Sequence, residues 1–472
     1  MITVEKINNP DYLIEHSKHE YYTESDNQKG YFAGRLMRLH KLEGKEVDEK
    51  TFKRYLDFGK KDGFAGVEFD PAPPKDFTIL LERATPKERE ELLGIHKEAI
   101  QGVIKAIEEN TYYRKTENGK TRYELAKAVG FAHFTHFTAR PTIDENGNQK
   151  IDCQLHDHIV AFPKVLGQDG KYYSHTLLDS KYEKHNKHET LRYFDQTYQY
   201  NLAKGLQSKG YAIERGTKDN FRIKGVSQDL VDEFSNRTKQ AENKVGKDAS
   251  YQDKKQASLK ARNKKVVSDL KDLRPLWQDR MEKHGFTTDK MESIKSKQED
   301  LDLSFTDTFK DNDIISAKAL KIKALSEAKF STKTMEEKLD EYKSVKMQKI
   351  GKHYINPKTK AGKALTKQPS NKKLSFKSKD KPAPSPQAKG HKQSATAGMK
   401  QSEMIQVAID NLKGQYQAKL AEVATKAHSK PNIEHAEMSK VISDYNKSES
   451  ELNSQLAQAL LNETRQTQDF DL

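Results

Sequence analysis

Cysteine and long apolar segments are both scarce in this chain of 472 residues. A single cysteine excludes an internal disulfide framework and is typical of a reducing compartment. No apolar run reaches the roughly 18 residues needed to cross a membrane, and the first residues do not form a signal peptide. We therefore expect a cytoplasmic protein without stable membrane insertion.

Motifs of common nucleotide-dependent enzymes are also absent. The chain contains no Gly-x-x-x-x-Gly-Lys-Ser/Thr sequence, so it is not a P-loop motor. Gly-rich dinucleotide fingerprints and Gly-x-Ser-x-Gly elbows are missing as well. Charge, in contrast, is abundant: 33% of the residues are charged, and the net charge is +14. This excess of positive charge favours a polyanionic partner.

The pattern of helices and strands over residues 1–245 predicts one catalytic domain. Apolar residues at helical spacing predict a long helix over residues 86–110. Because strands and helices do not alternate regularly, we expect an α+β fold, with an antiparallel sheet and helices packed on its faces. The other elements that the argument uses are a helix over residues 34–61, a helix over 227–239, and strands over 66–70, 130–139 and 152–162.

Three further segments are expected after this domain: a helical extension packed on it, a basic low-complexity linker with helical segments, and a C-terminal helical hairpin or coiled coil (residues 246–290, 291–400 and 401–472). Trp277 is expected to anchor the extension on the domain. The linker is inferred from composition, since twelve Lys and one Asp lie between Gly351 and Lys392. The C-terminal helices are typical of a partner-binding device.

Two strands carry the histidines that suggest a metal site. Side chains alternate between the faces of a strand, so His156 and His158 lie on the same face. A histidine of the upstream strand, His133 or His136, would complete a three-nitrogen set if the two strands are neighbours. Three protein ligands with open coordination positions are typical of a catalytic metal. The alternative is that neighbouring histidines arise by chance in a chain with 16 of them.

The histidine strands lie within a longer pattern. The segment from Phe134 to Arg140, followed by Gln154 to His158, resembles the core motif of the TrwC/TraI-type conjugative relaxases. That motif is His-x-Thr-Ser-Arg followed by Asp-Pro-Gln-Leu-His-Thr-His. The likeness covers roughly residues 1–288. The other matching segments are Gly66 to Lys75, Asp169 to Lys171, Tyr198 to Leu206, Lys209 to Tyr211, Phe234 to Thr238 and Leu276 to Gln278.

The resemblance implies an HUH-type, palm-like relaxase fold and DNA nicking by a tyrosine. It assigns a divalent metal ion (Mg²⁺, Mn²⁺ or another transition metal) to His136, His156 and His158. The tyrosine hydroxyl attacks the scissile phosphate and forms a covalent phosphotyrosine, which conserves the bond energy for rejoining. Tyr21 is the preferred nucleophile, because it lies at a polar turn. The remaining assignments are Tyr12 and Tyr22 as alternative nucleophiles, Glu68 as an orienting or proton-accepting carboxylate, and Lys75, Arg140, Lys171 and Arg237 as DNA contacts.

The sequence departs from the family pattern at three motif positions. Glu68 stands where the family has Asp, Ala139 where it has Ser, and Cys153 where it has Pro. Only one tyrosine pair occurs near the N-terminus, and the helicase half that is common in the family is missing. Three functions stay open: a transfer-origin relaxase, a DNA-binding accessory protein that has lost catalysis, and a rolling-circle replication initiator. As a relaxase, the protein would have two partners: single-stranded DNA at a transfer origin and, through its C-terminal region, the conjugative transfer or coupling machinery.

Overall fold

The computed structural model describes most of the first 344 residues and short pieces beyond them. The described ranges are 2–7, 30–59, 64–143, 147–177, 187–217, 220–261, 269–300, 314–344, 348–350 and 353–355, with Glu451 and Gln455. The chain divides into two compact units, residues 1–302 with 324–335, and residues 303–323 with 336–472. The candidate nucleophiles Tyr12, Tyr21 and Tyr22 lie outside the described residues, as does nearly all of the expected C-terminal hairpin.

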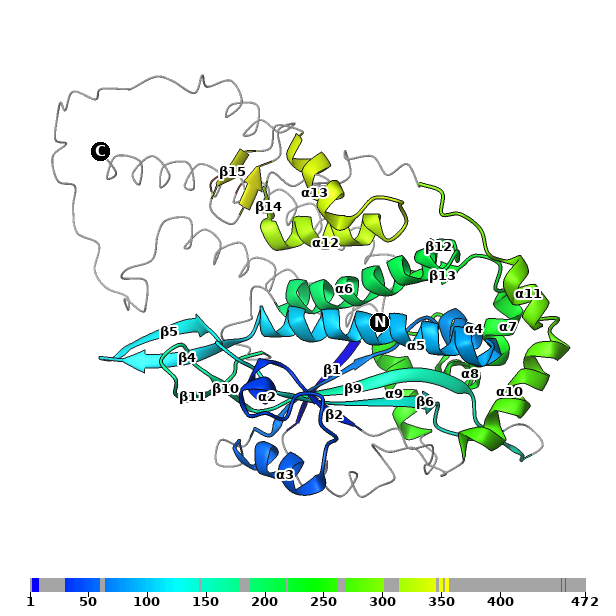
Figure 1. Cartoon of the computed structure of the whole chain (residues 1–472), viewed down its shortest axis with the longest axis horizontal. Helices are drawn as coiled ribbons and strands as arrows, with labels where there is room; N and C mark the ends of the chain where they lie inside the picture. Colours follow the sequence, from blue (N-terminus) through cyan, green and yellow to red (C-terminus); the bar gives the residue numbers. More distant parts are fainter. Residues whose placement is uncertain are drawn as a thin grey trace, which may run out of the picture. The chain divides into compact units, whose positions relative to one another are not determined.

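A five-stranded sheet forms the centre of the first unit (Figure 1). Its order is β1 (Ile2–Ile7), β3 (Gly66–Pro71), β9 (Cys153–Ala161), β6 (Phe131–Thr138) and β2 (Tyr31–Ala33). Every neighbouring pair of strands is antiparallel. The expected α+β class with an antiparallel sheet is therefore confirmed, and the two histidine strands are neighbours.

Three helices cover one face of this sheet, namely α4 (Lys75–Arg83), α5 (Pro86–Glu108) and α6 (Lys187–Ser208). Helix α5 begins where the sequence predicts. Thr85 and Glu88 form a capping box there, and Pro86 fits the first turn because its missing N–H is not needed. Helices α5 and α6 lie side by side along the sheet (Figure 1). Their buried apolar residues, such as Val103 and Leu202, form the core on this face.

The opposite face is covered at one end by α2 (Arg35–Leu39) and α3 (Glu49–Asp57). The prediction of one helix over residues 34–61 was wrong. Lys41 (φ 58°) and Gly44 (φ 75°) adopt left-handed backbone conformations, which end α2. Asp48 then caps α3 anew by accepting a hydrogen bond from the Thr51 amide at 2.8 Å.

The core under α3 fixes which end of β9 is covered. Phe52, Tyr55 and Leu56 pack against Val160 and Phe162. His156 and His158 occupy the same strand face as Val160 and Phe162, toward the other end of β9. The fold therefore separates an apolar end of this face from a histidine end.

Short hairpins and helices complete the first unit. The hairpins among its described residues pair β4 (Tyr112–Glu117) with β5 (Lys120–Leu125), β7 (Thr142–Ile143) with β8 (Gln149–Lys150), β10 (Lys164–Leu166) with β11 (Tyr172–Ser174), and β12 (Ile213–Arg215) with β13 (Phe221–Ile223). Its other helices in residues 220–300 are α7 (Gln228–Glu233), α8 (Asn236–Val245), α9 (Tyr251–Lys260), α10 (Leu270–Lys283) and α11 (Thr288–Ser293). The single helix expected over 227–239 is thus two helices, because Phe234 and Ser235 leave the helical conformation.

Helix α10 is anchored as the sequence predicts. Trp277 is 1% exposed, and its indole N–H donates to the carbonyl oxygen of Ile151 at 2.9 Å. Three residues along, Arg280 donates to Oδ1 of buried Asp152 at 2.9 Å. These bonds fasten the helical extension to the segment that leads into β9.

Part of the region expected to be a linker is folded. Residues 324–335 belong to the first unit, where Leu325 and Phe330 are buried. Lys329 donates to the side-chain oxygens of Gln196 and Gln199 at 2.9 and 3.1 Å. The remaining described elements are α12 (Ala317–Ala328), α13 (Met335–Ser344) and a sheet of β14 (Ile314–Ser316), β16 (His353–Ile355) and β15 (Gln348–Ile350). None of the described helices has the length and apolar composition required to span a bilayer.

Candidate metal centre

The pairing register of β6 and β9 brings three histidines to one face of the sheet. His136 lies directly opposite His156, so their side chains leave the sheet on the same side. His158 follows two residues later and therefore shares this face. His133 has the opposite parity and lies on the other face, which resolves the choice between His133 and His136 that the strand pattern left open.

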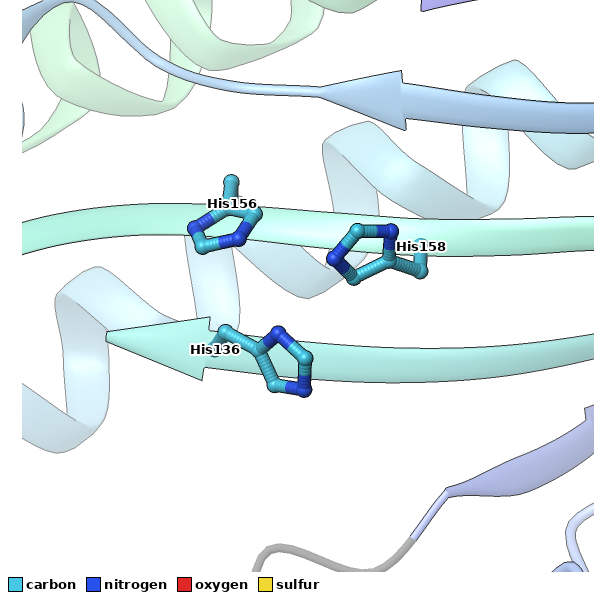
Figure 2. Close-up of side chains that lie close together, drawn as sticks. All are labelled: His136, His156 and His158. Carbon is cyan, nitrogen blue, oxygen red and sulfur yellow. The ribbon is translucent and has the colours of Figure 1, made fainter. Parts of the chain in front are cut away.

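The three imidazoles face one another closely enough to share an ion. One ligand nitrogen of each ring can be chosen so that all three lie within 4.8 Å of one another. The ring centroids are 4.8 to 5.3 Å apart, and the ring planes are steeply inclined to one another. Figure 2 shows the ring of His136 on β6 opposite the rings of His156 and His158 on β9. His136 and His158 are buried, and His156 is half-buried.

Hydrogen bonds fix which nitrogen each β9 histidine presents. Nδ1 of His158 donates to Glu68 Oε1 and Asp70 Oδ1, both at 2.9 Å. Nδ1 of His156 donates to the carbonyl oxygen of Gln154 at 3.0 Å. In both rings Nδ1 is thus held by an acceptor, which makes Nε2 the candidate metal ligand, the usual arrangement around a protein-bound metal.

The same contacts set the pKa values of the two rings in opposite directions. Burial lowers the pKa of His158, but the hydrogen bonds to Asp70 and Glu68 outweigh this effect and raise it to about 9. Burial and the neighbouring His158 charge lower the pKa of His156 to about 4. The carboxylates of β3 thus create a strongly negative environment behind one imidazole, and this environment also favours a bound cation.

Asp70 is a site residue that sequence reasoning missed. Glu68 and Asp70 are two residues apart on β3, so both side chains lie on the histidine face of the sheet. Thr3 on β1 donates to the second oxygen of Asp70 at 3.0 Å and holds it in place. The available signal was the alternation Glu-Phe-Asp itself, which predicts two carboxylates on one face where the family pattern drew attention to one.

A second polar cluster lies on the opposite face, directly behind the histidines. Asp157 is fully buried and accepts hydrogen bonds from His96 of α5, from His133 at 2.5 Å and from Thr135 at 2.7 Å. The hydroxyl of Tyr198 on α6 lies 3.2 Å from Nδ1 of His96. Burial would raise the pKa of Asp157, but the charge of His96 and the bond from His133 hold it well below its usual range. Asp157 lies between the ligand positions His156 and His158 in β9. Its hydrogen bonds connect this part of β9 to β6 and to the helices on the opposite face.

We expect Asp157→Ala to destabilise the protein by about 3–5 kcal/mol, because it leaves buried donors without their shared acceptor. Urea unfolding at pH 7 measures this change. Asp279→Ala is the matched control, since Asp279 is 60% exposed and forms an ion pair with Lys283 at the surface. Its replacement is expected to cost less than about 1 kcal/mol. Equal effects of the two substitutions would contradict a stabilising role for the Asp157 cluster.

The other residues assigned from the sequence lie in different surroundings. Lys75 donates to the carbonyl oxygen of Cys153 at 2.8 Å, and burial lowers the pKa of Lys75. Cys153 is a buried thiol whose pKa burial raises to about 12. Arg140 follows β6, Arg237 lies on α8, and both are half-buried. Lys171 is exposed in the turn between β10 and β11, beyond the far end of β9 from the histidines. Glu68, in contrast to these residues, lies with the three histidines and accepts a hydrogen bond from His158.

The donor set fits a divalent metal ion. Two of the three imidazoles are oriented by acceptors on Nδ1, and one of these is bonded to two carboxylates, an arrangement typical of metal-bound histidine. Imidazole ligands suit later transition metals, and three protein ligands leave coordination positions for a substrate.

Comparison with known proteins agrees with this geometry. The family model described as TrwC relaxase matches residues 7–284. The chain belongs to the TrwC relaxase family. Its relatives include the multifunctional conjugation protein TraI of Escherichia coli, which is 25% identical over 291 residues, 56% of this chain and 15% of the relative. The counterpart from strain K12 is 24% identical over 290 residues, with the same coverage of both chains. This chain therefore matches only a small part of these relatives' length.

Solved structures of TrwC share the fold of the first unit. The metal-bound complex of conjugative relaxase TrwC with oriT DNA has a TM-score of 0.51 and 22% identity, covering 60% of this chain and 99% of that chain. The metal-free complex has a TM-score of 0.50 and 21% identity, with 61% and 99% coverage. At this level of identity, the likeness supports the fold of the TrwC relaxase region and leaves the chemistry to be argued from the residues.

Proposed function

We propose that this protein is a conjugative relaxase that nicks one DNA strand at a transfer origin and rejoins it. The observation that carries the proposal is the convergence of His136, His156 and His158 within 4.8 Å, with two carboxylates behind His158. Membership of the TrwC relaxase family and the net charge of +14 support a DNA substrate. The related TrwC was solved as a metal-bound complex with oriT DNA, which supports a metal-binding role for the three histidines here.

The reaction is a transesterification at phosphorus. His136, His156 and His158 would hold a divalent cation, which would supply Lewis-acid chemistry at the scissile phosphate. A tyrosine oxygen attacks the phosphorus and forms a bond to the 5′ phosphate, while the bond from phosphorus to the 3′ oxygen breaks and that oxygen takes up a proton from water. Glu68 is the candidate acceptor for the tyrosine proton, and with Asp70 it holds the ring of His158 in position. Rejoining is the reverse reaction and needs no ATP.

The metal and the DNA contacts are part of the same proposal. Mg²⁺ and Mn²⁺ are common in phosphoryl transfer, while three imidazoles favour later transition metals. Arg140 and Lys171 are basic residues outside the described helices and are proposed to contact DNA phosphates together with Lys75 and Arg237. Lys75 would have to exchange its bond to the Cys153 carbonyl for such a contact.

The proposal is tested by capture of a covalent adduct. The protein is incubated with Mn²⁺ and a library of labelled single-stranded DNA, the mixture is extracted under denaturing conditions, and protein-linked DNA is sequenced. A single enriched cleavage site is expected, and EDTA should suppress it. DNA binding without any adduct would instead identify a non-catalytic accessory protein.

We further propose that the C-terminal region binds the conjugative transfer or coupling machinery and is not needed for cleavage. A protein ending at Ser344 is expected to form the adduct within about twofold of the full chain, because it keeps residues 324–335 of the first unit. A protein ending at Asp300 lacks the buried Leu325 and Phe330 and is expected to unfold at lower urea. If the protein that ends at Ser344 forms no adduct, the C-terminal region is needed for cleavage.

A further inference from the structure

A pocket of about 650 Å³ lies beyond the apolar end of β9. It opens between α3, the loop that follows α2, and the β10–β11 hairpin. Its volume falls within the range of roughly 300–1,000 Å³ that is usual for small-molecule sites. Its lining consists of His40, Leu42, Arg54, Tyr55, Phe58, Lys164 and Tyr172. We call it the aromatic pocket.

A hydrogen-bonded histidine holds the aromatic pocket together. His40 bonds through Nδ1 to the hydroxyl of Tyr55 and through Nε2 to the hydroxyl of Tyr172, the latter at 2.9 Å. Burial and the charge of Arg54 lower the pKa of His40, so one ring nitrogen donates and the other accepts. The ring of Tyr55 is in turn stacked on Phe162, with centroids 4.9 Å apart. His40 is thus held at both ring nitrogens, and Tyr55 is held at its hydroxyl and at its ring face. This part of the pocket wall is therefore pre-formed.

The exposed rings of the pocket suit a flat, unsaturated ligand. Phe58 and Tyr172 keep 47% and 49% of their surface exposed, although each is a large aromatic residue. Arg54 and Lys164 add two cations, and the lining contains no carboxylate. The guanidinium of Arg54 lies 5.4 Å from the centroid of the Tyr55 ring. Aromatic faces beside cations are the combination that binds an unpaired base together with its phosphate.

The position of the pocket relates it to the histidine centre. Phe162, which supports Tyr55, directly follows β9 and is four residues from His158 with the same parity, a separation of about 13 Å at 3.3 Å per residue. Tyr55 of the pocket wall stacks on Phe162, so the pocket lies beyond Phe162 along this face, and one bound strand of DNA that passes the histidine centre can extend to it. A pocket for a free metabolite would not need this alignment with the centre.

We propose that the aromatic pocket holds one unpaired base of the bound DNA strand, with a neighbouring phosphate at Arg54 and Lys164. The inference rests on the proposed function, because it takes single-stranded DNA as the ligand. It adds a site outside the reacting centre, with the base stacked on Tyr172 and Phe58. The exposed Lys171, next to Tyr172 in the same hairpin, adds positive charge at the rim.

The test compares two substitutions of one residue in the full chain. Binding of fluorescein-labelled dT12 is measured by anisotropy, with a 12-base-pair duplex of mixed sequence as the second probe. Tyr172→Ala is expected to weaken dT12 binding about tenfold, within the range that one base–aromatic stack contributes. Tyr172→Phe keeps the ring and is expected to bind within about twofold of the unchanged protein. Leu276→Ala is the distant control, since Leu276 is 61% exposed on α10.

Two further measurements separate the stack from the charge. Arg54→Gln and Lys164→Gln are each expected to reduce the slope of log affinity against log salt by about 0.7, as one lost phosphate contact on a single strand would. Ultraviolet cross-linking of an oligonucleotide containing 5-iododeoxyuridine is expected to label the peptide that carries Tyr172 or Phe58. Urea unfolding of each variant checks that the fold is retained.

The outcomes distinguish this proposal from the proposed function. Equal dT12 affinity of Tyr172→Ala and the unchanged protein overturns the pocket, even if the covalent adduct forms. An equal loss for the duplex probe also overturns it, because the pocket would then hold duplex phosphates rather than an unpaired base. An unchanged protein that binds no single-stranded DNA and forms no adduct rejects both proposals.

Discussion

Replacing His156 with alanine is expected to abolish metal retention and DNA nicking together. His156 lies opposite His136 and beside His158, and its Nδ1 is already bonded to the Gln154 carbonyl oxygen, so its Nε2 is the nitrogen available to a metal. Substitutions of residues that only orient a ligand typically cost 10–100-fold in metal affinity or activity, so loss of the ligand itself should exceed about 100-fold. Elemental analysis after dialysis and the adduct assay measure the two effects.

His284→Ala is the matched control for this substitution. His284 is exposed at the end of α10, so its loss is expected to change neither metal content nor nicking. Full nicking by a variant with alanine at His136, His156 and His158 would reject the metal centre. Retained metal with lost nicking would show that these histidines act in some other way.

The two carboxylates behind His158 give a graded version of the same experiment. Because Nδ1 of His158 donates to both Glu68 and Asp70, either acceptor can hold the ring when the other is neutralised. Glu68→Gln or Asp70→Asn alone is therefore expected to weaken metal binding less than the double variant. A double variant with unchanged metal affinity would show that the carboxylates do not orient the ligand.

The sequence predicted those features of the metal centre that depend on the alternation of side chains along one strand. Alternation along β9 predicted the common face of His156 and His158, and the register of β6 adds His136. Parity alone could not choose between His133 and His136, because the choice depends on a pairing between strands that are distant in sequence. The family resemblance supplied that choice, and the structure places His136 opposite His156.

The features that sequence reasoning missed are those that combine distant segments. The cluster around Asp157 joins β9, β6, α5 and α6. No local sequence pattern predicts that a charged residue between two histidines is fully buried. The aromatic pocket likewise draws its lining from α3, the loop after α2, and the β10–β11 hairpin. The prediction of one helix over residues 34–61 was wrong for a different reason. Lysine has a high helix propensity, which favoured a continuous helix. The left-handed backbone of Lys41 is set instead by the turn that ends α2.

The nucleophile is the second substitution with a large expected effect. Tyr21→Phe keeps the ring and removes only the hydroxyl, so the covalent adduct is expected to fall below detection while single-stranded DNA binding survives. Tyr21 belongs to the Tyr21–Tyr22 pair, which precedes Gly30 and the strand β2. Strand β2 pairs with β6, the strand that carries His136, so the chain enters the sheet beside the metal centre soon after this pair.

Tyr12 is the competing nucleophile, and single substitutions decide between the two. It follows β1, which pairs with β3, the strand that carries Glu68 and Asp70. On either side of residues 8–29, the chain therefore forms a strand that is paired with a strand of the metal centre. Closeness to such a strand does not distinguish Tyr12 from Tyr21. Adduct formation on labelled single-stranded DNA is compared for Tyr12→Phe, Tyr21→Phe and Tyr22→Phe. Loss of the adduct in Tyr12→Phe alone would assign the attack to Tyr12, whereas an adduct that persists with all three replaced would reject an N-terminal tyrosine mechanism.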